Sequence, residues 1–112
     1  MLITTTATIA GHRITSHLGL VRGNTIRAKH VGKDIIAGFR MIIGGEIKEY
    51  TEMFTEARNE AILRMKADAG RIDADAIVNV RFVTAQVMTG AAELLAYGTG
   101  VKVERVNNSE TE

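Results

Sequence analysis

Three acidic residues in the second half of the chain are candidates for a chemical role. Asp73 and Asp75 form an Asp-x-Asp pair, which in an extended segment places two carboxylates on one side. With Glu93 from a neighbouring strand they could hold a hard divalent metal ion, the one cofactor that these residues suggest. We favour a structural role, in which Asp75 fixes a helix-to-strand turn by bonding backbone amides.

Glu93 also interrupts an otherwise apolar strand, where a buried carboxylate needs a partner such as Arg81. A carboxylate perturbed by burial could act as a general acid or base, so an enzyme that uses Glu93 or Asp75 with Arg58 is one hypothesis. The interpretation we favour is an ion pair of Glu93 with Arg81, formed between strands or between subunits. Arg58 has a structural alternative too, a salt bridge with Glu52 or Glu56 on its own helix or with Asp34 across the fold.

Histidine and cysteine usage offers little to a soft metal. The chain has no cysteine, which excludes thiolate ligands and disulfides. His12 and His17 lie five residues apart across an expected turn at Gly11, and with a carboxylate they could form a weak metal site. Isolated histidines on strands are more often surface residues. Ser16 precedes His17, but adjacent strand side chains point to opposite faces, so we assign no catalytic residue and favour a non-enzyme.

Composition describes an ordinary globular protein. The 112 residues are 46% hydrophobic and 24% charged, which suits one domain over residues 1–106 and a disordered polar tail over 107–112. No apolar run reaches the ~18 residues of a membrane span, and no signal peptide is recognised, so we expect a cytoplasmic protein without membrane contact. Five basic residues and no acidic one precede Asp34. Without interleaved aromatic residues this patch does not favour nucleic acid, and it could meet an acidic part of a neighbouring subunit.

The first half of the chain is predicted to contain extended segments and a short helix. Glycine-containing pairs at Gly11-His12 and Gly23-Asn24 are expected to break the extended segments. The predicted elements are strands over 2–9, 14–21 and about 25–31, and a helix from Asp34 to Ile43.

The second half contains the clearest element, a long helix over about 46–69. Apolar residues at three- and four-residue steps form one stripe along it, and Gly70 is expected to end it. Strands follow over 74–84 and about 91–106, with a loop at 86–90. Strict alternation is expected in the first of these strands. The middle of the last strand is apolar on both faces, while one helix can cover only one face. We therefore expect an α+β fold whose remaining face is buried against other subunits.

Six short segments, in this order along the chain, resemble segments of one family. They are Ile14 to Gly23, Asp34 to Arg40, Gly44-Gly45 followed by Tyr50, Ala57-Arg58-Asn59-Glu60-Ala61, Ala74 to Val78, and Gly98-Thr99-Gly100-Val101. The ordered set spans about 90 of the 112 residues and resembles the YbjQ-like family, an uncharacterised protein family whose members also carry a heavy-metal-binding label. No single segment is specific, but their order is.

The resemblance implies a dodecin-like β-α-β-β subunit, with an antiparallel sheet packed on one long helix and a short helix before it. It also implies assembly into a ring, with the homopentamer as the expected form, and a metal or small ligand bound in the ring lumen or between subunits. A dodecin-like module that stores an aromatic cofactor is the alternative. Arg58 matches the family's Ala-Arg-x-x-Ala segment and is the preferred ligand or interface position.

The chain departs from the family pattern at two positions, where glycine is usual and this sequence has Asp73 and Asn79. Asp73 replaces a turn glycine, and aspartate tolerates such backbone angles better than most residues. Asn79 adds an amide to a strand where glycine would leave room, so a ligand that approaches there would be met differently.

Overall fold

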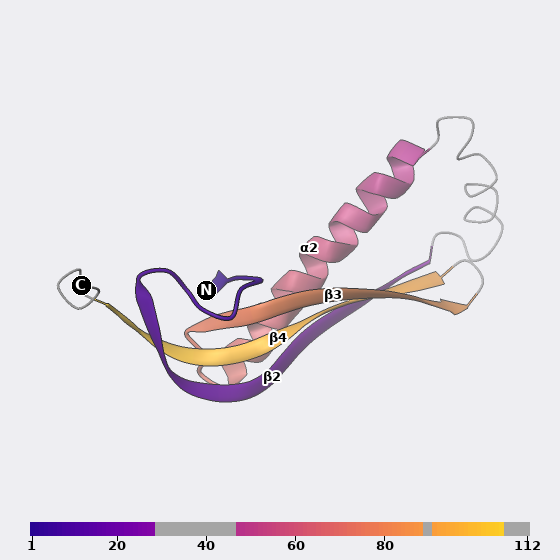
Figure 1. Cartoon of the computed structure of the whole chain (residues 1–112). Coiled ribbons are helices and arrows are strands. Elements are labelled where there is room, and N and C mark those ends of the chain that lie inside the picture. The colour runs from indigo at the N-terminus through magenta and orange to yellow at the C-terminus, as the bar shows by residue number, and fades with distance from the viewer. Residues whose placement is uncertain (29–46, 89–90, 107–112) are drawn as a thin grey trace.

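The computed structural model describes residues 1–28, 47–88 and 91–106. The short helix expected over 34–43 and the tail at 107–112 lie outside these residues. In chain order the elements are β1 (Leu2–Ile3), β2 (His12–Ala28), α2 (Ile47–Arg71), β3 (Ala76–Met88) and β4 (Ala91–Arg105) (Figure 1). The α+β class, the long helix and the last strand are confirmed, and β2-α2-β3-β4 has the expected β-α-β-β order.

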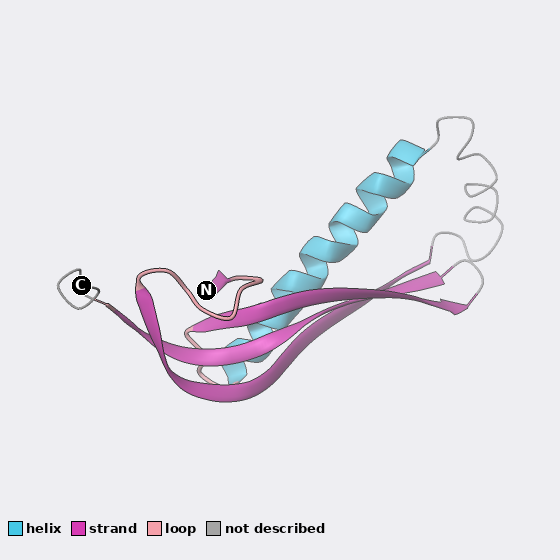
Figure 2. Cartoon of the chain, in the orientation of Figure 1, coloured by secondary structure: helices cyan, strands magenta, loops and turns pink. Residues whose placement is uncertain are grey.

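The four strands form one sheet in the order β1-β3-β4-β2 (Figure 2). β4 lies in the middle and runs antiparallel to both β2 and β3. β1 runs parallel to β3, with Leu2 opposite Ala76. The sheet is therefore mixed, and the expectation of a purely antiparallel sheet is wrong at this edge.

The strand expected over residues 2–9 ends at Ile3. Beyond it the threonines bond one another and the local backbone, since Thr4 Oγ1 and Thr6 Oγ1 lie 2.7 Å apart and the Thr6 hydroxyl donates to Thr8 O at 2.6 Å. Such local bonds compete with a strand ladder. The segment then crosses the sheet and buries Ile9 in a small cluster with Ala76, Val78 and Val101.

β2 is one strand of 17 residues, and the expected break at Gly23-Asn24 is wrong. Gly23 lies directly beneath α2. A Cβ atom built there would stand 2.3 Å from both the Ala61 carbonyl oxygen and the Met65 amide nitrogen. Glycine is needed at this position because a helix backbone packs on a strand backbone, and no turn is involved.

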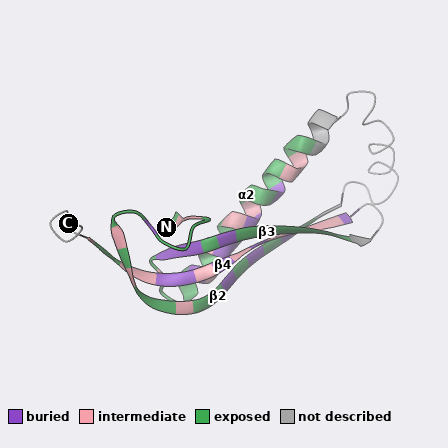
Figure 3. Cartoon of the chain, viewed as in Figure 1, coloured by how far each residue is buried: buried purple, intermediate pink, exposed green. Residues whose placement is uncertain are grey.

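The main core lies between α2 and the sheet. Ala57, Ala61, Met65 and Ala69 form a stripe of buried residues along the C-terminal half of the helix, and Met65 is the largest side chain that is fully buried. Towards its N-terminus the helix moves away from the sheet (Figures 1 and 3), and Met53 and Phe54 are only half-buried. The residues that complete this core from the sheet are Val21, Ile77, Val80, Leu94 and Ala96.

Asp73, rather than Gly70, ends the helix. The Asp73 amide donates to Gly70 O at 3.2 Å, and the Ala74 amide donates to Ala69 O at 3.0 Å. These two bonds make a Schellman motif, which requires a left-handed residue, and Asp73 has φ of 60°. The expected turn role of Asp73 is confirmed, whereas Gly70 lies inside the helix with open space around it.

Asn79 changes which side chains of β3 point towards the helix. Its φ is 54°, and the pairing with β4 shifts by one residue between Val78 and Arg81. This β-bulge ends the strict alternation that the sequence predicts. Ile77 and Val80 therefore face the helix, while Val78 faces the opposite side with Ile9. The usual family glycine at this position has its reason in the backbone angle, which asparagine tolerates.

The molecule is long and thin, with extents of 58 × 27 × 15 Å and a radius of gyration of 18.1 Å. A compact domain of this length has a radius of gyration of about 13 Å. One helix and one short crossing segment cannot cover both faces of so long a sheet. The residues that the structure describes leave a large part of one sheet face without cover.

Candidate functional site

We call the uncovered part of the sheet the open face, and define it by side chains that point away from α2. On β2, Val21, Gly23 and Thr25 are buried on the helix side, so the residues between them point the other way. The register aligns them in rows with β4 and β3. The open face comprises Leu20, Arg22, Asn24 and Ile26 of β2, Arg81 and Val83 of β3, and Glu93, Leu95 and Tyr97 of β4.

Five of the nine side chains of the open face are apolar or aromatic, and the other four are polar or charged. Leu20 is 67% exposed, Ile26 57% and Val83 46%, whereas Leu95 and Tyr97 are half-buried. Val83 is directly opposite Leu95, whereas Leu20 is opposite Thr99 and Ile26 is opposite Glu93, so apolar and polar side chains are mixed across this face. The crossing segment with Ile9 covers only the other end of this sheet side (Figure 3).

Two polar contacts are set into the open face. Asn24 Nδ2 donates to Glu93 Oε2 at 3.1 Å, which leaves the other carboxylate oxygen of Glu93 able to accept. Arg81 Nη1 donates to Thr5 O at 2.8 Å and to Val80 O at 2.9 Å, and so ties the crossing segment to the sheet. The Glu93–Arg81 ion pair expected between strands is not formed within the chain. The reason is register, because Arg81 is opposite Tyr97, four residues or about 13 Å along β4 from Glu93.

Asp75 has a structural role, but it bonds a backbone amide of β4 instead of the helix-to-strand turn that was expected. Its Oδ2 accepts from the Val103 amide at 3.0 Å, and its Oδ1 lies 3.4 Å from Lys102 Nζ. The hydrogen bond from the Val103 N–H is the main cause that holds the pKa of Asp75 below its ordinary value. Desolvation acts in the opposite direction, and the nearby Lys102 charge lowers the pKa further. The carboxylate thus clips the start of β3 to the end of β4.

The proposed carboxylate metal site is not assembled. Asp75 lies beside Val103, and Glu93 lies ten residues earlier on β4, about 33 Å away. Asp73 is exposed at the helix end. In the part of the chain that the structure describes, no three or more His, Cys, Asp or Glu side chains gather where they could hold a metal ion.

The histidines do not form a pair either. His12 and His17 both belong to β2, opposite Arg105 and Val101, so no turn separates them. A register shift between them brings both onto the same sheet side, but their partners are four positions, about 13 Å, apart along β4. His12 Nδ1 is 3.0 Å from Ala10 O. The donors of the described residues in one copy therefore do not fit a heavy-metal site.

Arg58 and Asn79 stand apart from the open face. Arg58 is exposed on α2, on the other side of the sheet from Glu93, and donates to Thr55 Oγ1 at 3.2 Å. The salt bridge considered for it is not formed with any described acid. Asn79 is exposed at the bulge, where its backbone N–H donates to Thr6 O. An enzyme that combines Glu93 or Asp75 with Arg58 finds no support in this arrangement.

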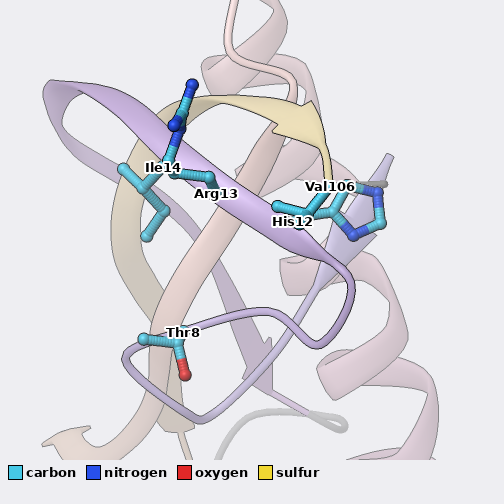
Figure 4. A pocket seen from close by; sticks show the side chains of 5 residues that line it. All are labelled: Thr8, His12, Arg13, Ile14 and Val106. Carbon is cyan, nitrogen blue, oxygen red and sulfur yellow. The ribbon is translucent and has the colours of Figure 1, made fainter. Parts of the chain in front are cut away.

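One surface hollow was not foreseen from the sequence. It has a volume of about 390 Å³ and lies at the start of β2, lined by Thr8, His12, Arg13, Ile14 and Val106. Figure 4 shows His12 beside Val106 and Thr8 on the separate crossing segment. Arg13 is paired with Glu104 across the strands, so its charge is already balanced. The hollow is open and brings together no set of unpaired polar groups.

The open face was only partly foreseen. The two-faced character of β4 predicted that one side would lack cover, but Leu20 and Ile26 were not singled out. The alternation of Leu20, Arg22, Asn24 and Ile26 against buried partners is visible in the sequence only when β2 is taken as one strand. The expected break at Gly23-Asn24 concealed it.

Fold and surface together define a class, a small α+β subunit with a mixed four-stranded sheet, one covering helix and one uncovered apolar side. The family comparison is specific. Residues 1–104 match the YbjQ family model, described as "putative heavy-metal-binding", and the chain belongs to this family.

Curated relatives support the assignment over almost the whole chain. A UPF0145 protein of Dehalococcoides mccartyi is 62% identical over 104 residues, which are 93% of this chain and 100% of that protein. A UPF0145 protein of Methanosarcina acetivorans is 60% identical over 103 residues, 92% of this chain and 97% of its own length. The names of these relatives assign no activity.

A solved structure shows the same fold. It is a protein of unknown function of the DUF74 family from Pediococcus pentosaceus, with a TM-score of 0.65 and 21% identity. The match covers 93% of this chain and 98% of the other. Among the described residues, no helix has the length and apolar character that crossing a membrane requires.

Proposed function

We propose that this chain is a non-enzymatic subunit that assembles with its own copies into a ring and binds a small ligand between them. The observation that carries the proposal is the open face, where Leu20, Ile26 and Val83 are exposed beside Leu95 and Tyr97. Apolar surface gathered in one place is unfavourable in water and marks an interaction site. The family resemblance supports five copies and a dodecin-like arrangement.

Charge on the subunit fits association with a second copy. Arg22 is exposed on β2, and Glu52 and Glu56 are exposed on α2, with no ion-pair partner among the described residues. Regions of opposite sign on one chain can meet between neighbouring copies, which favours a head-to-tail order. β2, which carries Arg22, contains no phenylalanine, tyrosine or tryptophan on which a nucleic-acid base could stack.

The open face also indicates the kind of ligand. Asn24 and Glu93 form a hydrogen-bonded pair within an apolar surface, and Arg22 is directly opposite Tyr97. Sites for small molecules combine an apolar lining with a few convergent polar groups. We infer a ligand with an apolar body and a hydrogen-bonding group, held where open faces meet. A heavy metal would need donors from several copies, since one copy does not supply them.

The test is native mass spectrometry of untagged protein, compared with Leu20→Glu and the matched control Leu63→Glu. Leu63 is 62% exposed on α2, so the control makes the same change at similar exposure away from the open face. We expect a five-fold mass for the wild type and the control, and smaller species for Leu20→Glu. A monodisperse wild-type monomer at micromolar concentration would overturn the proposal.

The same spectra report what the assembly retains. Extra mass that is lost on Leu20→Glu supports a ligand between copies, and optical absorbance typical of flavin would favour the dodecin-like storage alternative. A metal-sized adduct would favour a metal shared between copies. A clean multiple of the subunit mass after gentle purification from its natural host would contradict the ligand part and leave the assembly intact.

A further inference from the structure

The two outer strands of the sheet differ in whether their outward-pointing backbone groups have hydrogen-bond partners. β2 is the outer strand on one side, and α2 guards its middle. The Arg22 amide donates to Asp68 Oδ2 at 2.9 Å, and Arg64 Nη1 donates to Asn24 O at 2.6 Å. Natural sheets protect edges in this way against pairing with other chains.

The outer edge of β3 is closed only at its beginning. The Val80 amide donates to Thr4 O and the Asn79 amide to Thr6 O, both at 3.0 Å. In an antiparallel ladder, backbone groups point alternately towards and away from the neighbouring strand. Since Val80 N points outward, the backbone groups of Phe82, Thr84 and Gln86 also point outward, where the described residues provide no partner.

The open part of this edge lacks charge and proline, two of the usual protecting features, although the pairing with β4 shifts near its end between Gln86 and Met88. No charged residue and no proline occurs from Phe82 to Ala92. Residues 82–86 are all exposed, and Phe82 is 43% exposed although its side chain lies on the helix side. The helix has moved away from the sheet at this end. An exposed, uncharged edge strand rich in β-forming residues is a template for another strand.

We propose that a strand of a second copy of this chain adds to β3 at Phe82–Met88. The inference rests on the proposed function and specifies how copies join. The strand that fits is the end of the neighbour's β2 from Ile26 to Ala28, because α2 leaves its outward groups unguarded beyond Asn24. β2 and β3 are the two opposite outer strands, so their pairing continues the sheet from copy to copy, as a ring requires.

The charges of the two segments permit this contact. The β3 segment from Phe82 to Met88 carries no charge, so the end of an approaching β2 meets no like charge within it. β2 and β3 are both antiparallel to β4 and hence parallel to each other within one copy. A continued sheet therefore joins copies through parallel strands.

Hydrogen exchange of the assembled wild type is the first test. In an assembly joined in this way, the amides of Phe82, Thr84, Gln86 and Ile26 exchange at least tenfold more slowly than in dissociated subunits. Free exchange at Phe82, Thr84 and Gln86 in an intact oligomer overturns the inference and leaves the proposed assembly standing. Protection of these amides with free exchange at Ile26 overturns the β2 pairing.

Proline substitution gives a matched pair of variants. Thr84→Pro removes an outward N–H and is tolerated by an unpaired edge, whereas Val83→Pro removes an N–H that points to β4. We expect Thr84→Pro to dissociate the assembly while circular dichroism shows a folded subunit, and Val83→Pro to unfold it. Thr84→Lys is a second variant that keeps the backbone and is expected to dissociate the assembly too. Intact oligomers of both Thr84 variants would contradict the inference.

Discussion

The two sides of the same sheet differ more in cover than in composition. On the helix side, Val21, Thr25, Leu94 and Ala96 are buried beneath α2, and the Thr25 hydroxyl donates to Ala57 O at 3.2 Å. On the other side, Leu20 and Ile26 of the same strand are exposed. One strand thus carries apolar residues towards a helix and towards water. Within the described residues, α2 covers one side of the sheet and leaves apolar residues of the other side exposed.

The largest effect on stability is expected from truncating a residue of α2 that is buried against the sheet, compared with an exposed residue of the same helix. Met65→Ala removes the largest fully buried side chain and should lower the free energy of unfolding by about 3 kcal/mol, because it leaves a cavity. Leu63→Ala, two residues earlier and exposed, should change it by less than about 0.5 kcal/mol. Urea denaturation at one fixed protein concentration measures both. Equal effects would show that Leu63 is also buried in solution.

The close helix contact at Gly23 gives the next effect. Gly23→Ala places a methyl group against two backbone atoms of α2 and should cost about 2 kcal/mol of unfolding free energy. Gly70→Ala is the control, since nothing lies within 4 Å of the position that a Cβ atom would take there, and a helical alanine should stabilise by about 0.5–1 kcal/mol. Thermal denaturation should move in opposite directions for the two variants. A neutral Gly23→Ala would mean that helix and strand are further apart.

Substitutions of Asp73, whose backbone is left-handed, should have smaller effects on stability, and glycine and alanine should act in opposite directions. Asp73→Gly should stabilise the subunit by about 0.5 kcal/mol, because glycine adopts positive φ without steric cost. Asp73→Ala should destabilise it by about 1 kcal/mol. Chemical denaturation of the pair tests whether the Schellman motif ends the helix. Destabilisation by glycine would point to a role for the carboxylate itself.

The smallest effect concerns pH and the covered end of the sheet. The pKa of Asp75 is held below its ordinary value of 3.8, chiefly by the Val103 N–H bond. Its carboxylate therefore adds stability above pH 3.8, and this contribution is lost as pH falls through the lower folded pKa. Asp75→Asn should remove this pH-dependent part. Denaturation curves of the two proteins should converge at acid pH, and a difference that is constant with pH would refute the assignment.

Much of the fold was predictable because it depends on local patterns. The helical stripe and the two-faced last strand follow from residue types at regular spacing, and the turn role of Asp73 follows from the family resemblance, in which glycine is usual at this position. The errors share one cause. The sequence predicts a break at Gly23 and the end of the helix at Gly70, although the role of each glycine depends on whether another backbone approaches it. That information is not local.

The candidate site was predictable in kind but not in its residues. The need for cover on one side of β4 was inferred from the sequence, whereas Leu20, Ile26 and Val83 were placed there only by strand pairing. Glu93 does lie on this face, but its partner is Asn24 rather than Arg81. Cross-strand partners depend on register, and the β-bulge at Asn79 shifts that register by one residue.

Residue order alone was enough to establish the α+β class of this protein, the extent of its long helix and its membership of a family through segments in a recognisable order. These properties reside in periodicity and local backbone preference. The folded chain was needed to establish which apolar residues are buried, which charged groups meet and which sheet edge is guarded. Those outcomes depend on contacts between residues far apart in the chain, such as Asp68 with Arg22 and Asp75 with Val103.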